Sequence, residues 1–243
     1  MKTRILLAIL IFLPLLVSAK KKPETYSQYA YGIQHTGTSL TLTFEKGKQH
    51  NHPLFAIWLA DENGRFLETL YVSETIGKGV FPRVNRETGH WMAGEIQRPA
   101  ALPYWVHQRH LLNASGNYLP TPTQPEVDGV TGATPQTSFV MNLKTSELLE
   151  GKYQVMLELN QSWDWNEFWY NDKFPGDKEY MTSSQPALVY TALIDTKRPD
   201  SVYEMRPVGH SHYSGKDGNL TADLSTLTTA LKIAKRITVE IRK

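Results

Sequence analysis

Residues 53–73 read PLFAIWLADENGRFLETLYVS, with two apolar segments on either side of the sequence Asp61-Glu62-Asn63-Gly64. Apolar runs of this length that flank a turn signal are typical of two paired strands. Asn-Gly at the centre supplies the positive φ angles of a tight turn. The stretch therefore predicts a β-hairpin, and strand patterns dominate the rest of the chain as well.

In SLTLTFEKG (39–47), Leu40, Leu42 and Phe44 alternate with polar residues, so one face of the strand is expected in a core and the other in water. The remaining predicted strands are TSFVMNLK (137–144), GKYQVMLELN (151–160), PALVYTALID (186–195) and ITVEIRK (237–243). About seven strands separated by Gly, Pro and Asn/Asp turns predict an all-β fold, an antiparallel immunoglobulin-like β-sandwich.

Two segments do not follow the strand pattern. Residues 77–112 are punctuated by Gly and Pro, and YWVHQRHLL (104–112) predicts a short helical excursion there. Residues 163–180, WDWNEFWYNDKFPGDKEY, are too aromatic and too acidic for a plain loop. Long connections on a rigid sandwich are where functional residues usually lie.

The first nineteen residues, MKTRILLAILIFLPLLVSA, place two basic residues before an apolar run that closes on small residues. This pattern predicts a signal peptide (1–19), followed by a single β-sandwich domain (20–243). The chain has no cysteine, which excludes a lipid-acceptor thiol, disulfides and thiolate metal ligands. We expect a periplasmic or secreted protein that does not span the membrane after signal cleavage.

Charge and local motifs exclude several function classes. Without Lys2 and Arg4 the chain has 24 basic and 24 acidic residues (26 minus 2 against 24), so its net charge is 0. A neutral surface gives no electrostatic support for binding nucleic acid or anionic lipid. The chain contains neither a Gly-x-Ser-x-Gly nor a His-Glu-x-x-His sequence. We expect no enzyme activity of its own, although a catalytic carboxylate pair leaves no local signature and stays open.

Residues 127–136, VDGVTGATPQ, allow two interpretations. Gly132 and Ala133 leave the backbone uncrowded, Thr134 supplies a hydroxyl nucleophile, and Asp128 can anchor the segment, which together suit a site that another enzyme modifies. The alternative is a turn that leads into the next strand, with Asp and Thr side chains bonded to local amides. Pro135 pushes Thr134 toward an extended conformation in either case.

Several stretches together resemble an uncharacterised family of predicted bacterial periplasmic proteins, a domain of unknown function that is discussed beside extracytoplasmic flavin systems. The matching stretches are HPLFAIWLADENGRFLETLYVS (52–73), RHLL (109–112), DGVTGATP (128–135), SWDWNEF (162–168), QPALVYTALID (185–195) and GHSHYSGKDGNLTADLSTLTTA (209–230). They cover most of the chain after the signal peptide. The resemblance implies an exported protein with an immunoglobulin-like sandwich.

DGVTGAT (128–134) is also similar to the signal of the periplasmic FMN transferase, which attaches FMN through a phosphoester to the last Thr of Asp-x-x-Ser/Thr-Gly-Ala-Ser/Thr. The resemblance implies that Thr134 carries covalent FMN, with Asp128, Gly132 and Ala133 recognised around it. It further implies an accessory protein of a flavin-linked redox system, with the FMN transferase and a membrane redox protein as partners.

Two other groups of residues could bind a ligand. His210 and His212 are two apart, as are His50 and His52, so either pair could present two imidazoles to one Zn or Cu ion; solvated loop histidines are the alternative. Trp163, Trp165 and Trp169 could form a platform that stacks a sugar ring or an isoalloxazine, or could instead cap the sandwich core. These groups leave open a non-catalytic metal-binding, ligand-binding or protein-docking module.

Overall fold

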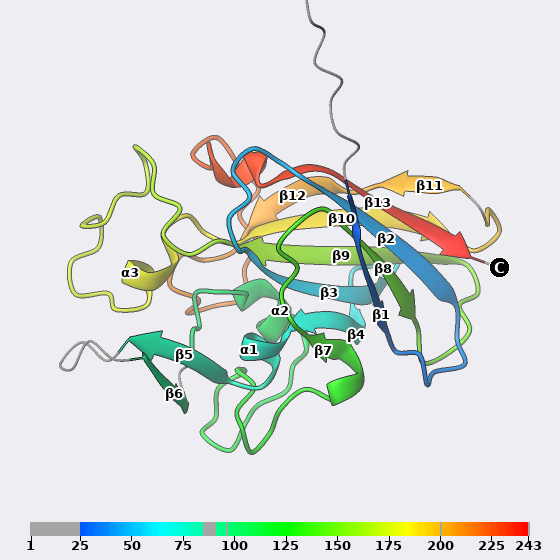
Figure 1. Cartoon of the computed structure of the whole chain (residues 1–243), viewed down its shortest axis with the longest axis horizontal. Coiled ribbons are helices and arrows are strands. Elements are labelled where there is room, and N and C mark those ends of the chain that lie inside the picture. The colour runs from blue at the N-terminus through cyan, green and yellow to red at the C-terminus, as the bar shows by residue number, and fades with distance from the viewer. Residues whose placement is uncertain (1–24, 85–90, 96, 200, 243) are drawn as a thin grey trace, which may run out of the picture.

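The computed structural model describes residues 25–84, 91–95, 97–199 and 201–242 (Figure 1). The expected signal peptide and His90 lie outside the described residues. One sheet has the strand order β1 (Ser27–Tyr31), β8 (Phe139–Lys144), β2 (Ser39–Lys46), β13 (Ala234–Arg242) and β11 (Val202–Glu204). The second sheet has the order β12 (Arg206–His210), β10 (Leu188–Asp195), β9 (Lys152–Asn160), β3 (Leu54–Asp61), β4 (Phe66–Ser73) and β7 (Thr131–Gly132).

The described helices are short and lie in the connections between strands. They are α1 (Glu74–Gly77), α2 (Pro103–Gln108), α3 (Tyr180–Ser183) and two single 3-10 turns, η1 (Asp128–Val130) and η2 (Ala230–Lys232). A separate hairpin of β5 (Val80–Val84) and β6 (Trp91–Glu95) lies to the left of α1 in Figure 1. The prediction of a mostly-β, sandwich-like fold with few short helices is confirmed.

The prediction of a wholly antiparallel sandwich is wrong, because both sheets are mixed. β1 runs parallel to β8, and β4 runs parallel to β7, while the other pairs within these two sheets are antiparallel. A parallel pair needs a long crossover connection. The excursion between β4 and β7 and the long chain between β1 and β8 provide these crossovers.

The alternating strands bury one face each in the core between the two sheets. Leu40, Leu42 and Phe44 of β2 lie there, as predicted. So do the residues Tyr153, Val155, Leu157 and Leu159 that alternate along β9. Phe44 stacks on Phe139 with ring centroids 4.9 Å apart, which joins β2 to β8 inside this core.

A second apolar cluster covers the opposite face of the β12–β7 sheet. Ala56, Trp58 and Ala60 of β3 pack there against Leu102 and Trp105 at α2. β3 is therefore buried on both faces, which explains why its sequence is a continuous apolar run and does not alternate. The helical excursion is thus part of the fold, since it covers one face of the central strand β3.

The hairpin that the sequence predicts forms between β3 and β4, but its turn is longer than a two-residue loop. Only Gly64 has a positive φ, +86°, and Asn63 does not. Asp61 closes the turn, because its carboxylate accepts the backbone N–H groups of Asn63 and Arg65, each at 2.9 Å. Gly64 alone therefore supplies the positive φ that was expected of Asn-Gly, and the Asp61 side chain closes the turn by hydrogen bonds.

The predicted helix at 104–112 is found as the shorter α2, Pro103–Gln108. Pro103 occupies the first turn, where its missing N–H has no intrahelical partner. The helix cannot continue beyond this region because His110 has a φ of +52°, outside the right-handed helical range. Leu111 and Leu112 are consequently exposed.

Candidate functional site

The segment 127–136 runs along the edge of the β12–β7 sheet, where one side of it is fixed by buried contacts. β7 pairs with β4 through Val72 and Ser73. The Tyr71 hydroxyl donates to the carbonyl oxygens of Gly132 (3.3 Å) and Ala133 (3.1 Å). Burial raises the pKa of Tyr71, so this hydroxyl keeps its proton and acts as a donor. The backbone of the segment is thereby held in one conformation.

Gly132 is needed for a structural reason. A Cβ atom at this position would lie 2.0 Å from the Tyr31 hydroxyl oxygen, so Tyr31 packs directly on the Gly132 backbone. The Tyr31 and Tyr71 rings in turn lie 4.8 Å apart. The glycine of the Thr-Gly-Ala-Thr sequence is therefore explained by close packing as well as by the uncrowded backbone expected from the sequence.

The other side of the segment is open to solvent. The Asp128 side chain is 90% exposed, and its only described partner is Lys78, whose ammonium lies 3.2 Å from Oδ1. The segment does turn here, since η1 leads directly into β7 and the Thr131 hydroxyl donates to the Asp128 carbonyl oxygen at 3.5 Å, although η1 has no side-chain capping bond. Ala133 is exposed as well. The side chains of Asp128 and Ala133, two of the four residues assigned to FMN attachment, are thus presented to solvent.

Thr134 lies in the connection from β7 to β8 and is half-buried. Its hydroxyl donates to Ser73 Oγ at 3.1 Å, and Ser73 also accepts the backbone N–H of Phe55 at 2.9 Å. Pro135 beside it is buried. The Thr134 hydroxyl therefore points toward fully buried Ser73, and this hydrogen bond, which contributes about 1 kcal/mol, must break before the hydroxyl could react.

Ser73→Ala tests this arrangement. Removal of the buried hydroxyl leaves the Phe55 N–H and the Thr134 hydroxyl without their acceptor, so we expect the free energy of unfolding to fall by about 1–3 kcal/mol. Urea denaturation measures the change. Ser146→Ala, in an exposed turn, is the matched control and should have no effect; equal stability of both variants would contradict the hydrogen bonds described.

The excursion that follows β9, residues 161–187, is held by a polar hub at Asn166. Its Oδ1 accepts the backbone N–H groups of Phe168 (2.8 Å) and Trp169 (2.7 Å). Its Nδ2 donates to the Thr226 carbonyl oxygen at 2.8 Å, and the Trp169 indole donates to Thr226 Oγ1 at 3.0 Å. The excursion is therefore fixed to the loop that precedes η2.

The three tryptophans of the expected platform do not share one surface. Trp169 is only 9% exposed and packs, with half-buried Trp165, against the core between the sheets. Trp163 alone projects into solvent, with 71% of its surface exposed. Trp165 and Trp169 therefore cap the core, as the alternative interpretation predicted. Of the three tryptophans, Trp163 is the one whose side chain is accessible to a ligand.

His210 and His212 do not form a metal site with a third ligand in the described part of the chain. Among the residues that the structure describes, no group of three His, Asp or Glu side chains converges. His210 is buried and its Nδ1 donates to the Ser211 carbonyl oxygen at 2.8 Å. His212 Nδ1 accepts the Ser214 backbone N–H at 3.2 Å. Gly218, in the loop that follows His212, packs against His107 of α2.

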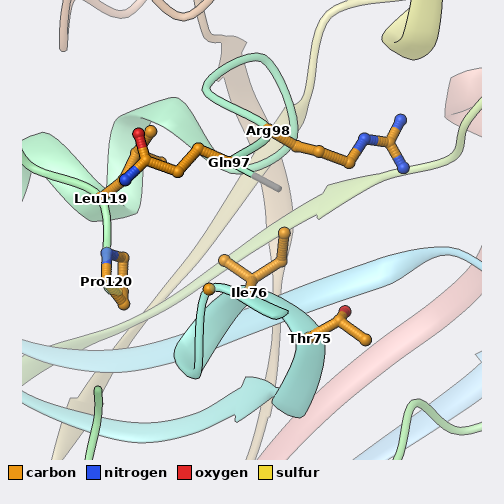
Figure 2. A pocket seen from close by; sticks show the side chains of 7 residues that line it. Thr75, Ile76, Gln97, Arg98, Leu119 and Pro120 are labelled. Atoms are coloured by element: carbon orange, nitrogen blue, oxygen red, sulfur yellow. The ribbon is translucent and has the colours of Figure 1, made fainter. Parts of the chain in front are cut away.

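Two cavities lie away from these residues. Figure 2 shows a pocket between α1 and the chain at 97–98 and 119–120, with a volume of about 10 Å³, the size of one water molecule. A wider groove of about 330 Å³ lies at the end of β2, β8 and β13, with Lys144 and Arg242 on its walls. Neither cavity is lined by Thr134 or Trp163.

One buried ionisable residue was missed by sequence reasoning. Glu158 of β9 is fully buried beneath α2, where its oxygens accept the backbone N–H groups of Tyr104 (3.1 Å) and Trp105 (2.7 Å). The sequence feature that could have identified Glu158 as buried is its place as a lone glutamate inside the apolar stretch VMLELN (155–160). Its role is to satisfy the N-terminal amides of α2, which have no intrahelical acceptor.

The described helices include none that is long and apolar enough to cross a membrane. Comparisons of the chain with protein-family models, curated proteins and solved structures found no match. Support for a function therefore comes from the geometry of the segment around Thr134 and from the resemblance of DGVTGAT (128–134) to the FMN transferase signal.

Proposed function

We propose that the protein is an exported accessory of a flavin-linked redox system and that Thr134 carries FMN through a phosphoester. One observation supports this proposal most strongly. Buried contacts fix the backbone of segment 128–134 on one side, while its other side is open to solvent and so accessible to an enzyme. Tyr71 and Tyr31 hold Gly132 and its neighbours, while Asp128 and Ala133 face solvent. An enzyme cleft could thus grip a preformed edge of the sheet.

The residues present fit an attached FMN. Ala133 adds little bulk beside half-buried Thr134, so a phosphoester on Oγ1 could extend into solvent once the side chain has rotated away from Ser73. The Asp128 side chain is 90% exposed, which suits a role in recognition by the transferase. When attached, FMN would supply the one- or two-electron chemistry that no side chain of a cysteine-free β-sandwich provides.

Attachment requires an activated donor such as FAD. The Thr134 Oγ1–phosphorus bond forms as the pyrophosphate bond of FAD breaks, AMP leaves, and the hydroxyl proton passes to a base of the transferase. Before that step the Thr134 hydroxyl must leave Ser73 Oγ. The partners implied are the periplasmic FMN transferase and a membrane redox protein that exchanges electrons with the flavin.

We further propose that the domain has an immunoglobulin-like topology. The antiparallel order β10-β9-β3-β4 at the centre of one sheet and β8-β2-β13 in the other supports an immunoglobulin-like topology. Export through the predicted signal peptide would bring this domain to the compartment in which the transferase works.

Substitution at position 134 tests the proposal. In cells that co-express the transferase, wild type and Thr134→Ser should show flavin fluorescence on a denaturing gel, because both have a hydroxyl. Thr134→Ala should show none, while Thr123→Ala, at an exposed threonine outside the segment 128–134, is the matched control and should keep it. Fluorescence in Thr134→Ala, or its absence from every variant beside an active transferase, would leave a non-catalytic binding or docking module as the function.

A further inference from the structure

Trp163 combines an unfavourable backbone conformation with an exposed side chain. Its φ is +60°, a left-handed value at which a bulky residue is an outlier and glycine is favoured. Its indole is 71% exposed. Among the described residues, this indole has no ring contact and donates no hydrogen bond. The fold therefore gains nothing from a tryptophan here and would be better served by glycine.

The backbone on both sides of Trp163 is fixed. Ser162 Oγ accepts a hydrogen bond from the Arg98 guanidinium at 2.9 Å. The Asp164 carbonyl oxygen accepts Gln185 Nε2 at 2.6 Å, and Asp164 Oδ1 accepts the Thr229 hydroxyl at 2.7 Å. The indole is thus presented from a rigid position, which reduces the entropy lost when it binds a ligand. Strained residues held in this way are concentrated at functional sites.

The surroundings of Trp163 in the sequence are polar as well as aromatic. The same excursion exposes Phe168 and Tyr170, and it interleaves them with exposed Glu167, Asn171 and Asp172. The core of a protein–protein interface is depleted of charged residues. A pyranose ring instead offers an apolar C–H face for an indole and a rim of hydroxyls for carboxylate and amide groups.

We propose that Trp163 is the stacking residue of an oligosaccharide-binding site on the excursion 161–187. The proposal is independent of Thr134, because the two positions lie in different connections, one between β7 and β8 and the other between β9 and α3. A protein partner is the competing occupant. It would require an apolar surface, whereas the exposed residues of this excursion include Glu167 and Asp172.

Calorimetric titration with cellotetraose, maltotetraose and chitotetraose tests the proposal on the mature protein. At least one tetrasaccharide should bind to wild type. Trp163→Gly should weaken that binding by about tenfold, the upper range of an aromatic contact. The same variant should melt at the same or a higher temperature, because glycine relieves the left-handed φ.

His52→Gly is the matched control, since His52 is also exposed and has a φ of +55° on a different loop. It should relieve the same kind of strain and leave oligosaccharide binding unchanged. Absence of binding to all three tetrasaccharides, or equal binding by wild type and Trp163→Gly, would overturn the proposal and favour a protein partner for this surface.

Discussion

Glu158→Ala is expected to lower the free energy of unfolding by about 3 kcal/mol or more. The substitution removes the acceptor for the buried N–H groups of Tyr104 and Trp105, and each unsatisfied buried donor costs about 1–3 kcal/mol. It also leaves a cavity between β9 and α2, which adds to the loss. Urea denaturation measures the change. A loss below that of Ser73→Ala would contradict the role of Glu158 beneath α2.

The same residue predicts a pH dependence of stability. Burial outweighs the two N–H hydrogen bonds and raises the pKa of Glu158 to about 8, whereas a glutamate in the unfolded chain titrates near 4.3. Between these values the folded state keeps a proton that the unfolded state has released. The contribution of Glu158 to stability is therefore fully present below about pH 4.3 and is lost as the pH rises toward about 8.

Glu158→Gln separates this effect from other titrating groups. The neutral amide cannot ionise, so the fall in melting temperature from pH 5 to pH 8 should be smaller in Glu158→Gln than in wild type. Glu62→Gln, at a position whose side chain is 61% exposed, is the control and should keep the wild-type dependence. An identical pH dependence in wild type and Glu158→Gln would show that Glu158 is ionised in the folded protein.

Tyr180→Ala should have an effect of similar size on the excursion that carries Trp163. Tyr180 is fully buried, and its hydroxyl donates to the Tyr170 carbonyl oxygen at 2.8 Å. Its ring lies against four other aromatic rings, those of Trp165, Trp169, Phe174 and Tyr213. Truncation of a buried aromatic residue costs about 3–5 kcal/mol.

Two measurements follow for Tyr180. The urea midpoint of Tyr180→Ala should fall strongly, and trypsin should cut the excursion at Lys173 or Lys178 faster than in wild type, because the loop loses its packing. Tyr180→Phe keeps the ring and loses one hydrogen bond, which contributes about 1 kcal/mol. Equal stability of the two variants would mean that the aromatic packing around Tyr180 does not hold the excursion.

The fold could be predicted from sequence where strands alternate, and less well elsewhere. The alternation of Leu40, Leu42 and Phe44 with polar residues predicts their strand, because a buried face repeats every second residue. β1, β7 and β11 are short edge strands whose pairing depends on distant partners, so their sequences carry little signal. The second apolar cluster was hidden as well, since Trp105 meets β3 only after the excursion folds back over the sheet.

The candidate site shows the same limit. The sequence named Thr134 and Trp163, but it could not show that the Thr134 hydroxyl bonds to Ser73, 61 residues away, or that Trp169 would be buried. His210 and His212 are close in sequence, yet β12 ends between them and their ring nitrogens take different local partners. Local spacing identifies candidate residues, while long-range packing decides which of them face solvent.

The most direct test of the central claim is the intact mass of the mature protein after co-expression with a periplasmic FMN transferase that modifies a known acceptor. Our account predicts an increase of one FMN less one water, with fragment masses that place it on Thr134. An unmodified mass, or a flavin attached at another residue, would contradict the assignment of Thr134 as the attachment point.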